Sequence, residues 1–222
     1  MLFRFKNYVI IRMNINKASL FIVNCYSLLL YGGKGSGEIN MINKEIVIWD
    51  NDGTIMGAKN PNDTSSGSKV ILPNIHNVMT NNKAVHIICS GCKTPESELQ
   101  NFEPENVIKR FLLLMEQLPI QAAVFSPAIG GIECYILIKK HSDNNVIVRK
   151  AHEEIRYKHL IGQFKKPGVG MLIVIQDLLK EEFGQIMSTV NSIMIGDTWH
   201  DEHAAKTIGI PFLDAKHIHN MK

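Results

Sequence analysis

Short continuous runs of apolar residues alternate with stretches that suit helices along most of the chain. The apolar runs fall at residues 46–49, 84–89, 122–126, 192–195 and 210–215. Runs of this length without a polar partner at every second position are typical of strands covered on both faces. The intervening pattern predicts helices at residues 73–83, 103–118, 150–164, 168–183 and 201–209. The alternation predicts an α/β fold, a mainly parallel sheet flanked by helices.

Two stretches depart from this alternation. Residues 132–149 hold two strand-like runs on either side of HSDNN, which predicts a hairpin. We expect this segment to be a small insert at the side or rim of the domain. Residues 58–68 are rich in Asn, Ser, Gly and Pro, and predict a polar loop.

The first forty residues differ in character from the remainder. Basic residues precede an apolar stretch at 18–31 and a Gly/Ser-rich segment at 32–37. The apolar stretch is shorter than the roughly 20 residues that a membrane-spanning helix needs. A secretory signal is one interpretation of its basic flank, and a leader or a segment packed on the domain is the other. We expect residues 1–40 to be a leader or appendage and residues 41–222 to be the working domain, with the Gly/Ser segment as a linker.

Composition narrows the functional classes. The chain has 222 residues, of which 45% are hydrophobic and 20% charged, so a folded core is expected. A net charge of +3 without a block of Lys and Arg disfavours a nucleic-acid-binding protein. Of four scattered cysteines, Cys89 and Cys92 form a C-x-x-C without a second pair, which argues against structural zinc. Scattered thiols favour a reduced compartment, the cytoplasm, with secretion as the alternative.

Polar side chains stand at the ends of three predicted strands. Asp50, Ser90 and Asp197 each follow or end an apolar run. Ligands of α/β sheets bind at the carboxyl ends of the strands, so these side chains are expected to converge on one crevice. A carboxylate at such a position is costly to desolvate unless a cation pairs with it.

Four segments together resemble the haloacid dehalogenase (HAD) superfamily of phosphohydrolases. WDNDGT at 49–54 is similar to the D-x-D-G-T motif of the family, and IICSG at 87–91 to its strand ending in Ser or Thr. KKPGVGM at 165–171 is similar to the lysine motif in its K-P-x-x-G-M form. IMIGDTWHD at 193–201 is similar to the G-D-x-x-x-D motif. The four occur in the family's order, and the resemblance implies a Rossmann-like HAD fold.

The resemblance assigns roles to these residues. Asp50 is the implied nucleophile, which forms an aspartyl-phosphate, and Asp52 is the implied general acid and base. Ser90, Gly91 and Lys166 are the implied phosphate-binding residues, and Lys166 also offsets the charge of Asp50.

The resemblance also implies a metal ion. The implied Mg²⁺ ligands are the side chains of Asp50 and Asp197 and the backbone carbonyl of Asp52, with Asp201 in a supporting position. Taken singly, these residues have ordinary structural interpretations: a turn at Asp50, or a helix cap at Asp201. The hypothesis depends on their joint occurrence.

The sequence leaves the substrate open. The short interval between Asp52 and Ser90 predicts little or no cap over the site. We expect a Mg²⁺-dependent phosphomonoester hydrolase that acts on a small phosphorylated metabolite. One alternative is a polynucleotide 3′-phosphatase, because the K-P-x-x-G-M form resembles the subgroup of histidinol-phosphatases and polynucleotide 3′-phosphatases. The other is a phosphotransferase that uses the same aspartyl-phosphate intermediate. Trp199, expected in a loop beside the last motif, is a candidate for contact with substrate. The basic residues of the predicted hairpin, a candidate patch for a nucleic-acid backbone, are Lys139, Lys140, Arg149 and Lys150.

Overall fold

The computed structural model describes residues 2–5, 8–11, 22–24, 44–58, 69–92, 104–127, 129–140 and 145–221. The chain divides by its contacts into two units, Met1–Met41 and Ile42–Lys222. In the first, strands β1 (Leu2–Phe5), β2 (Tyr8–Ile11) and β3 (Ile22–Asn24) form an antiparallel sheet in the order β1-β2-β3. The expected linker at 32–37 lies outside the described residues. Among the described helices, none is long and apolar enough to cross a membrane.

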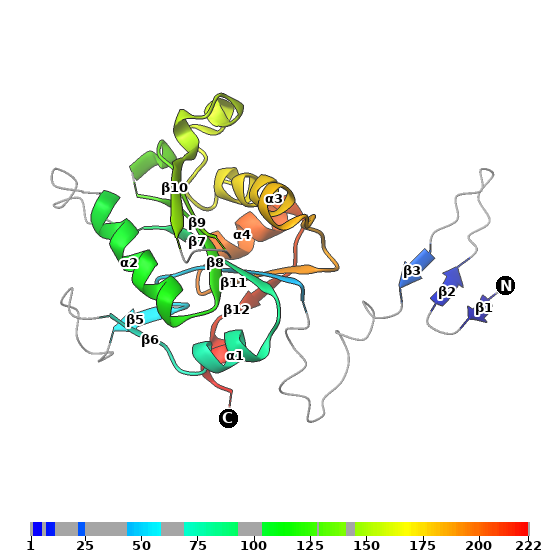
Figure 1. Cartoon of the computed structure of the whole chain (residues 1–222). Helices are drawn as coiled ribbons and strands as arrows, with labels where there is room; N and C mark the ends of the chain where they lie inside the picture. The colour runs from blue at the N-terminus through cyan, green and yellow to red at the C-terminus, as the bar shows by residue number, and fades with distance from the viewer. Residues whose placement is uncertain are drawn as a thin grey trace. The chain divides into compact units, whose positions relative to one another are not determined.

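The second unit is built on a seven-stranded sheet in the order β10-β9-β8-β7-β4-β11-β12 (Figure 1). Its strands are β4 (Ile46–Trp49), β7 (Val85–Gly91), β8 (Ile120–Ser126), β9 (Tyr135–Lys139), β10 (Val146–Lys150), β11 (Ser192–Gly196) and β12 (Phe212–Asp214). The five strands from β8 to β12 in this order pair in parallel, while β9 and β10 pair antiparallel at one edge. The predicted α/β fold with a mainly parallel sheet is confirmed, and it is compatible with a Rossmann-like topology.

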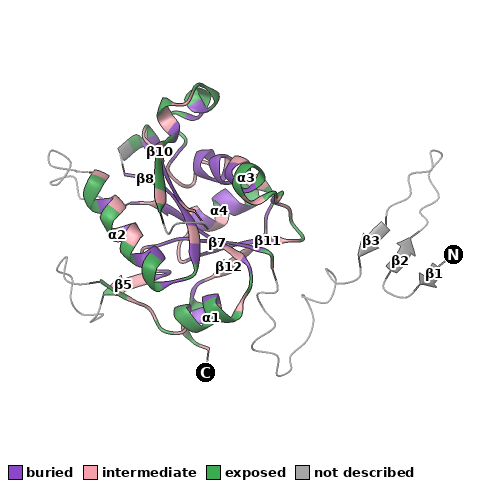
Figure 2. Ribbon diagram, viewed as in Figure 1, coloured by how far each residue is buried: buried purple, intermediate pink, exposed green. Residues whose placement is uncertain are grey.

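Helices cover both faces of this sheet (Figure 1). They are α1 (Ile75–Asn81), α2 (Pro104–Gln117), α3 (Gly170–Phe183), α4 (Trp199–Ile208) and α5 (Lys216–His219). The side chains of β4 alternate between two cores: Ile46 and Ile48 pack with α3 and α4, whereas Val47 and Trp49 pack with α1, α2 and α5. All four are fully buried, as expected of a central strand (Figure 2).

One local expectation needs correction, and another is made more specific. The segment 132–149 is a hairpin, as predicted, and its strands β9 and β10 lie at one edge of the main sheet. The helix expected at 150–164 is instead two short 3₁₀ helices, η6 (Ala151–Glu153) and η7 (Ile155–Leu160). Glu154 between them has an extended backbone, and charged residues separate the buried Ala151, Tyr157 and Leu160, so no continuous apolar stripe forms on one side.

The remaining elements are short. Strands β5 (Met56–Ala58) and β6 (Lys69–Ile71) form a separate antiparallel pair directly after β4. The 3₁₀ helix η5 (Ile129–Gly131) follows β8. In the main sheet the chain runs from β4 to β7 and β8 on one side, and later to β11 and β12 on the other. The crevice beyond the ends of β4 and β11 therefore lies at a switch point, where ligands of α/β proteins bind.

Candidate functional site

Asp50 and Asp197 stand directly beyond the ends of the adjacent strands β4 and β11. Alternation along β4 turns Asp50 to the same side as Ile46 and Ile48, toward α3 and α4. Gly196 allows α4 to come close, since a Cβ at this glycine would lie 2.5 Å from the Cβ of Asp201. The local sequence thus places one carboxylate on each of two strand ends and a third on the first turn of α4.

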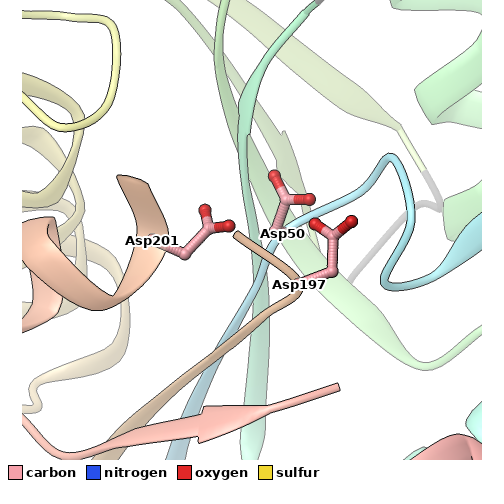
Figure 3. Close-up of side chains that lie close together, drawn as sticks. All are labelled: Asp50, Asp197 and Asp201. Carbon is pink, nitrogen blue, oxygen red and sulfur yellow. The ribbon is translucent and has the colours of Figure 1, made fainter. Parts of the chain in front are cut away.

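The three carboxylates form one cluster. Oxygen atoms of Asp50, Asp197 and Asp201 all lie within 4.8 Å of one another. Figure 3 shows Asp50 and Asp197 extending from the ends of their strands and Asp201 reaching in from α4, with their carboxyl groups turned toward a common region. Asp50 and Asp201 are 7% and 1% exposed. Asp197 is not buried. Two buried carboxylates this close together are expected only where cations compensate them.

Lys166 supplies one of these cations. Its ammonium lies 2.5 Å from Oδ1 of Asp50 and 2.5 Å from Oδ1 of Asp201, and donates a 2.8 Å hydrogen bond to the carbonyl of Cys89. Two of these contacts, to Asp50 and to Cys89, are hydrogen bonds, and the contact with Asp201 is an ion pair. Burial disfavours the charged form, but the acidic groups around it, Asp50 foremost, outweigh burial and raise the pKa of Lys166. Lys166 is therefore a fixed positive charge within the acidic cluster.

Asp201 also has a structural role. Its Oδ2 accepts hydrogen bonds from the backbone N–H and the hydroxyl of Thr198, at 3.1 and 2.6 Å, in a capping box at the start of α4. Its Oδ1 contacts Lys166. Since both oxygens have protein partners, Asp201 acts in this geometry by orienting Lys166 and the helix terminus.

The cluster brings more acidic groups together than the one buried lysine contacts. Asp50, Asp197 and Asp201 share one region, and Lys166 contacts two of them, Asp50 and Asp201. Burial raises the pKa of Asp50 to about 6; Lys166 opposes this rise, and the neighbouring carboxylates add to it. A divalent cation would neutralise the excess, and carboxylate oxygens are the ligands that hard cations take. The donor set therefore fits a metal ion, which Asp50 and Asp197 are best placed to hold.

The turn after Asp50 brings the next acidic residue to the site. Gly53 has a φ of +90°, and a Cβ there would lie 2.1 Å from Oδ2 of Asp197, so only glycine fits. Asp52 lines the same cavity as Asp50. Its Oδ1 lies 2.5 Å from the ammonium of Lys69 and accepts a 3.0 Å hydrogen bond from the amide of Asn51.

Lys69 is a site residue that the sequence did not indicate. It begins the short strand β6, and its side chain is 42% exposed. The hairpin of β5 and β6 folds back beside the turn at 50–53 and delivers this lysine to Asp52. One sequence signal could have suggested a strand here: Lys69 follows a polar stretch and precedes two apolar residues, Val70 and Ile71.

The candidate residues surround one cavity of about 230 Å³. The residues that line it are Asp50, Asp52, Gly91, Lys165, Lys166, Asp197, Thr198, Trp199, His200 and Asp201. Ser90 is not among these lining residues: it is 1% exposed, and its hydroxyl lies 4.0 Å from the sulfur of Cys92. The structure thus brings the predicted Asp50, Asp52, Gly91, Lys166, Asp197 and Asp201 to one cavity, whereas Ser90 is buried next to Gly91 near the end of β7 and does not line it.

The chain was compared with known proteins in two ways. No protein-family model matches it, and no curated protein sequence matches it.

Proposed function

We propose that this protein is a metal-dependent phosphomonoester hydrolase that works through an aspartyl-phosphate on Asp50. The proposal includes the HAD fold that the four motifs resemble and an open site with little or no cap. One observation carries it: Asp50 lies 2.5 Å from Lys166, 116 positions away, within a cluster that also holds Asp197 and Asp201. Surface turns and helix caps do not require such a buried assembly from distant segments.

The first step forms the covalent intermediate. A carboxylate oxygen of Asp50 attacks phosphorus, the bond from phosphorus to the leaving oxygen breaks, and Asp52 gives its proton to that oxygen. Lys166 holds Oδ1 of Asp50, which fixes the orientation of the carboxyl group, and among the described residues Oδ2 has a single 3.5 Å contact, from the hydroxyl of Thr54. A carboxylate oriented in this way is close to the geometry that attack requires.

The second step releases phosphate. Asp52, now ionised, takes a proton from water as the water oxygen bonds to phosphorus, and the bond to Asp50 breaks. Phosphate leaves and Asp50 returns as a carboxylate, with Asp52 protonated again. When bound by Asp50, Asp197 and the backbone carbonyl of Asp52, Mg²⁺ would supply positive charge to the phosphoryl oxygens. Gly91 lies at the cavity wall, and its N–H is a candidate backbone donor for those oxygens.

A panel of phosphomonoesters tests this proposal on the full chain. We expect hydrolysis that requires Mg²⁺, that EDTA abolishes, and that Asp50→Asn removes. The matched control is Asp214→Asn, because Asp214 ends the neighbouring strand β12 but accepts only the N–H of Lys216 among the described residues. This control should keep full activity. Hydrolysis that survives EDTA or Asp50→Asn would refute the proposal.

A further inference from the structure

Trp199 is an exposed aromatic residue on the rim of the acidic cavity. It is the first residue of α4 and is 61% exposed. Of the described large hydrophobic residues that are exposed, Trp199 alone also lines the cavity. Exposure of an indole costs free energy, because its large apolar surface stays in water. An indole at the mouth of a polar cavity is therefore well placed to bind a ligand.

The ring of Trp199 is held in place by its neighbours. It stacks on the ring of His200, with centroids 4.0 Å apart and planes at 28°, and the ring of His203 lies edge-on to it, with centroids 6.1 Å apart. The capping box of Thr198 and Asp201 fixes the turn from which the ring extends. A preorganised ring binds a flat partner at low entropic cost.

Lys165 adds a second cation at the rim. Its side chain passes close to Gly91, where a Cβ would lie 3.5 Å from Cγ of the lysine, and it lines the cavity. Within the described part of the chain, no carboxylate pairs with its ammonium, whereas Lys166 contacts Asp50, Asp201 and the carbonyl of Cys89. Lys165 is thus the cation of the pair that is available to an anionic substrate.

We propose that Trp199, backed by His200 and assisted by Lys165, stacks the base of a nucleoside phosphate whose phosphate enters the acidic cavity. This inference rests on the proposed function and names its substrate class. The difference in exposure between the two residues supports this substrate class, because Asp50 is 7% exposed and Trp199 is 61% exposed. A ring bonded directly to the phosphate oxygen would lie inside the acidic cavity, whereas a sugar between phosphate and base carries the ring out to the rim.

The surroundings favour a mononucleotide over a nucleic-acid end. The basic residues of the β9–β10 hairpin, a candidate track for a nucleic-acid backbone, all have protein partners. Lys140, Arg149 and Lys150 pair with Glu182, Glu154 and Glu153, and Lys139 donates to the carbonyl of Met115. Binding of an extended strand depends on lysines and arginines that are available to phosphates.

Steady-state kinetics with Mg²⁺ test the stacking role. Adenosine 5′-monophosphate and ribose 5-phosphate differ by the base alone. Loss of base stacking is expected to lower kcat/KM of Trp199→Ala for the nucleotide about tenfold, mainly through KM. Its kcat/KM for ribose 5-phosphate should fall far less than its kcat/KM for the nucleotide, and Trp199→Phe should retain most of the nucleotide activity. An equal loss on both substrates would overturn the proposal while leaving the hydrolase function intact.

Fluorescence gives a readout that does not depend on turnover. The chain has two tryptophans, and Trp49 is fully buried, so an added nucleotide can stack only on Trp199. In Asp50→Asn, adenosine 5′-monophosphate should quench the emission and ribose 5-phosphate should not. Trp199→Phe in the same background should abolish the quenching. Absence of quenching by the nucleotide would contradict the proposal, whatever the phosphatase assay shows.

A third comparison distinguishes a free mononucleotide from a nucleic-acid end as the substrate. Adenosine 3′-monophosphate and a short oligonucleotide with a 3′-phosphate are compared as substrates. A preference for the mononucleotides supports the proposal as stated. A higher kcat/KM for the oligonucleotide, lost in Trp199→Ala, would keep the stacking role but overturn the assignment to free nucleotides.

Discussion

Replacing Lys166 with methionine tests whether this lysine neutralises the buried carboxylates. Its side chain is 6% exposed, and the side chains of its partners Asp50 and Asp201 are 10% and 1% exposed. Methionine keeps the length of the chain and removes the charge, which leaves two buried carboxylates without their cation. Breaking a buried pair from one side typically costs about 3–5 kcal/mol of unfolding free energy. We expect Lys166→Met to fall in that range when measured by urea unfolding in EDTA.

A double-mutant cycle separates this charge effect from lost packing. Asp50→Asn leaves Lys166 paired with Asp201 and removes a desolvated carboxylate, so it should cost little alone. In the double variant the unpaired charge at position 50 is gone, and the total loss should be smaller than the sum of the two single losses by about 1–3 kcal/mol.

A surface pair provides the control for the same substitution. Lys206 contacts Glu202 on α4, with side chains 69% and 44% exposed. Exposed pairs of this kind contribute about 0–1 kcal/mol, so Lys206→Met should change stability little. If Lys166→Met cost no more than Lys206→Met, or if the cycle were additive, Lys166 would not be compensating buried charge and the account of the cluster would fail.

Two further predictions concern Lys69 and His86. Lys69→Met should lower kcat about tenfold with little change in KM, because Asp52 loses the partner that orients it for proton transfer; a rise in KM alone would show instead that Lys69 binds substrate. Burial lowers the pKa of His86, whose ring accepts a hydrogen bond from the indole of Trp49. Since the unfolded chain takes up the proton first, stability should fall as pH drops below about 6.5, by at most about 1.4 kcal/mol per pH unit from this group. In urea unfolding at pH 7.5 and 5.5, His86→Gln should lose that part of the pH dependence, and an unchanged dependence would contradict the assignment.

The apolar runs predicted the sheet because its central strands are buried on both faces. Ile46 to Trp49 face two cores at once, which requires a continuous apolar run. Polar residues immediately after such a run lie beyond the carboxyl end of the strand. Because β4 and β11 are parallel neighbours, Asp50 and Asp197 lie side by side. The hairpin prediction at 132–149 gave the antiparallel pairing of β9 and β10, but an apolar run does not show which sheet its strand joins, and the structure adds both strands to the main sheet.

The part of the site that the sequence missed comes from weakly patterned segments. Strand β6 has three residues, none of them buried, so neither alternation nor hydrophobicity marks it, and Lys69 reaches Asp52 only through the fold of the hairpin. The hydroxyl of Ser90 was expected at the phosphate, yet its orientation at the end of β7 depends on packing beside Cys92. Residue types and spacing predict which elements meet, whereas side-chain partners depend on tertiary packing.

Direct detection of the covalent intermediate tests the central claim. The full chain would be mixed with a phosphomonoester that it hydrolyses and Mg²⁺, quenched rapidly in acid, digested and examined by mass spectrometry. The account predicts one added phosphoryl group on the peptide that contains Asp50, greater accumulation in Asp52→Ala because breakdown by water is slowed, and none in Asp50→Asn. Turnover without a phosphorylated peptide at Asp50, or a phosphoryl group on another residue, would contradict it.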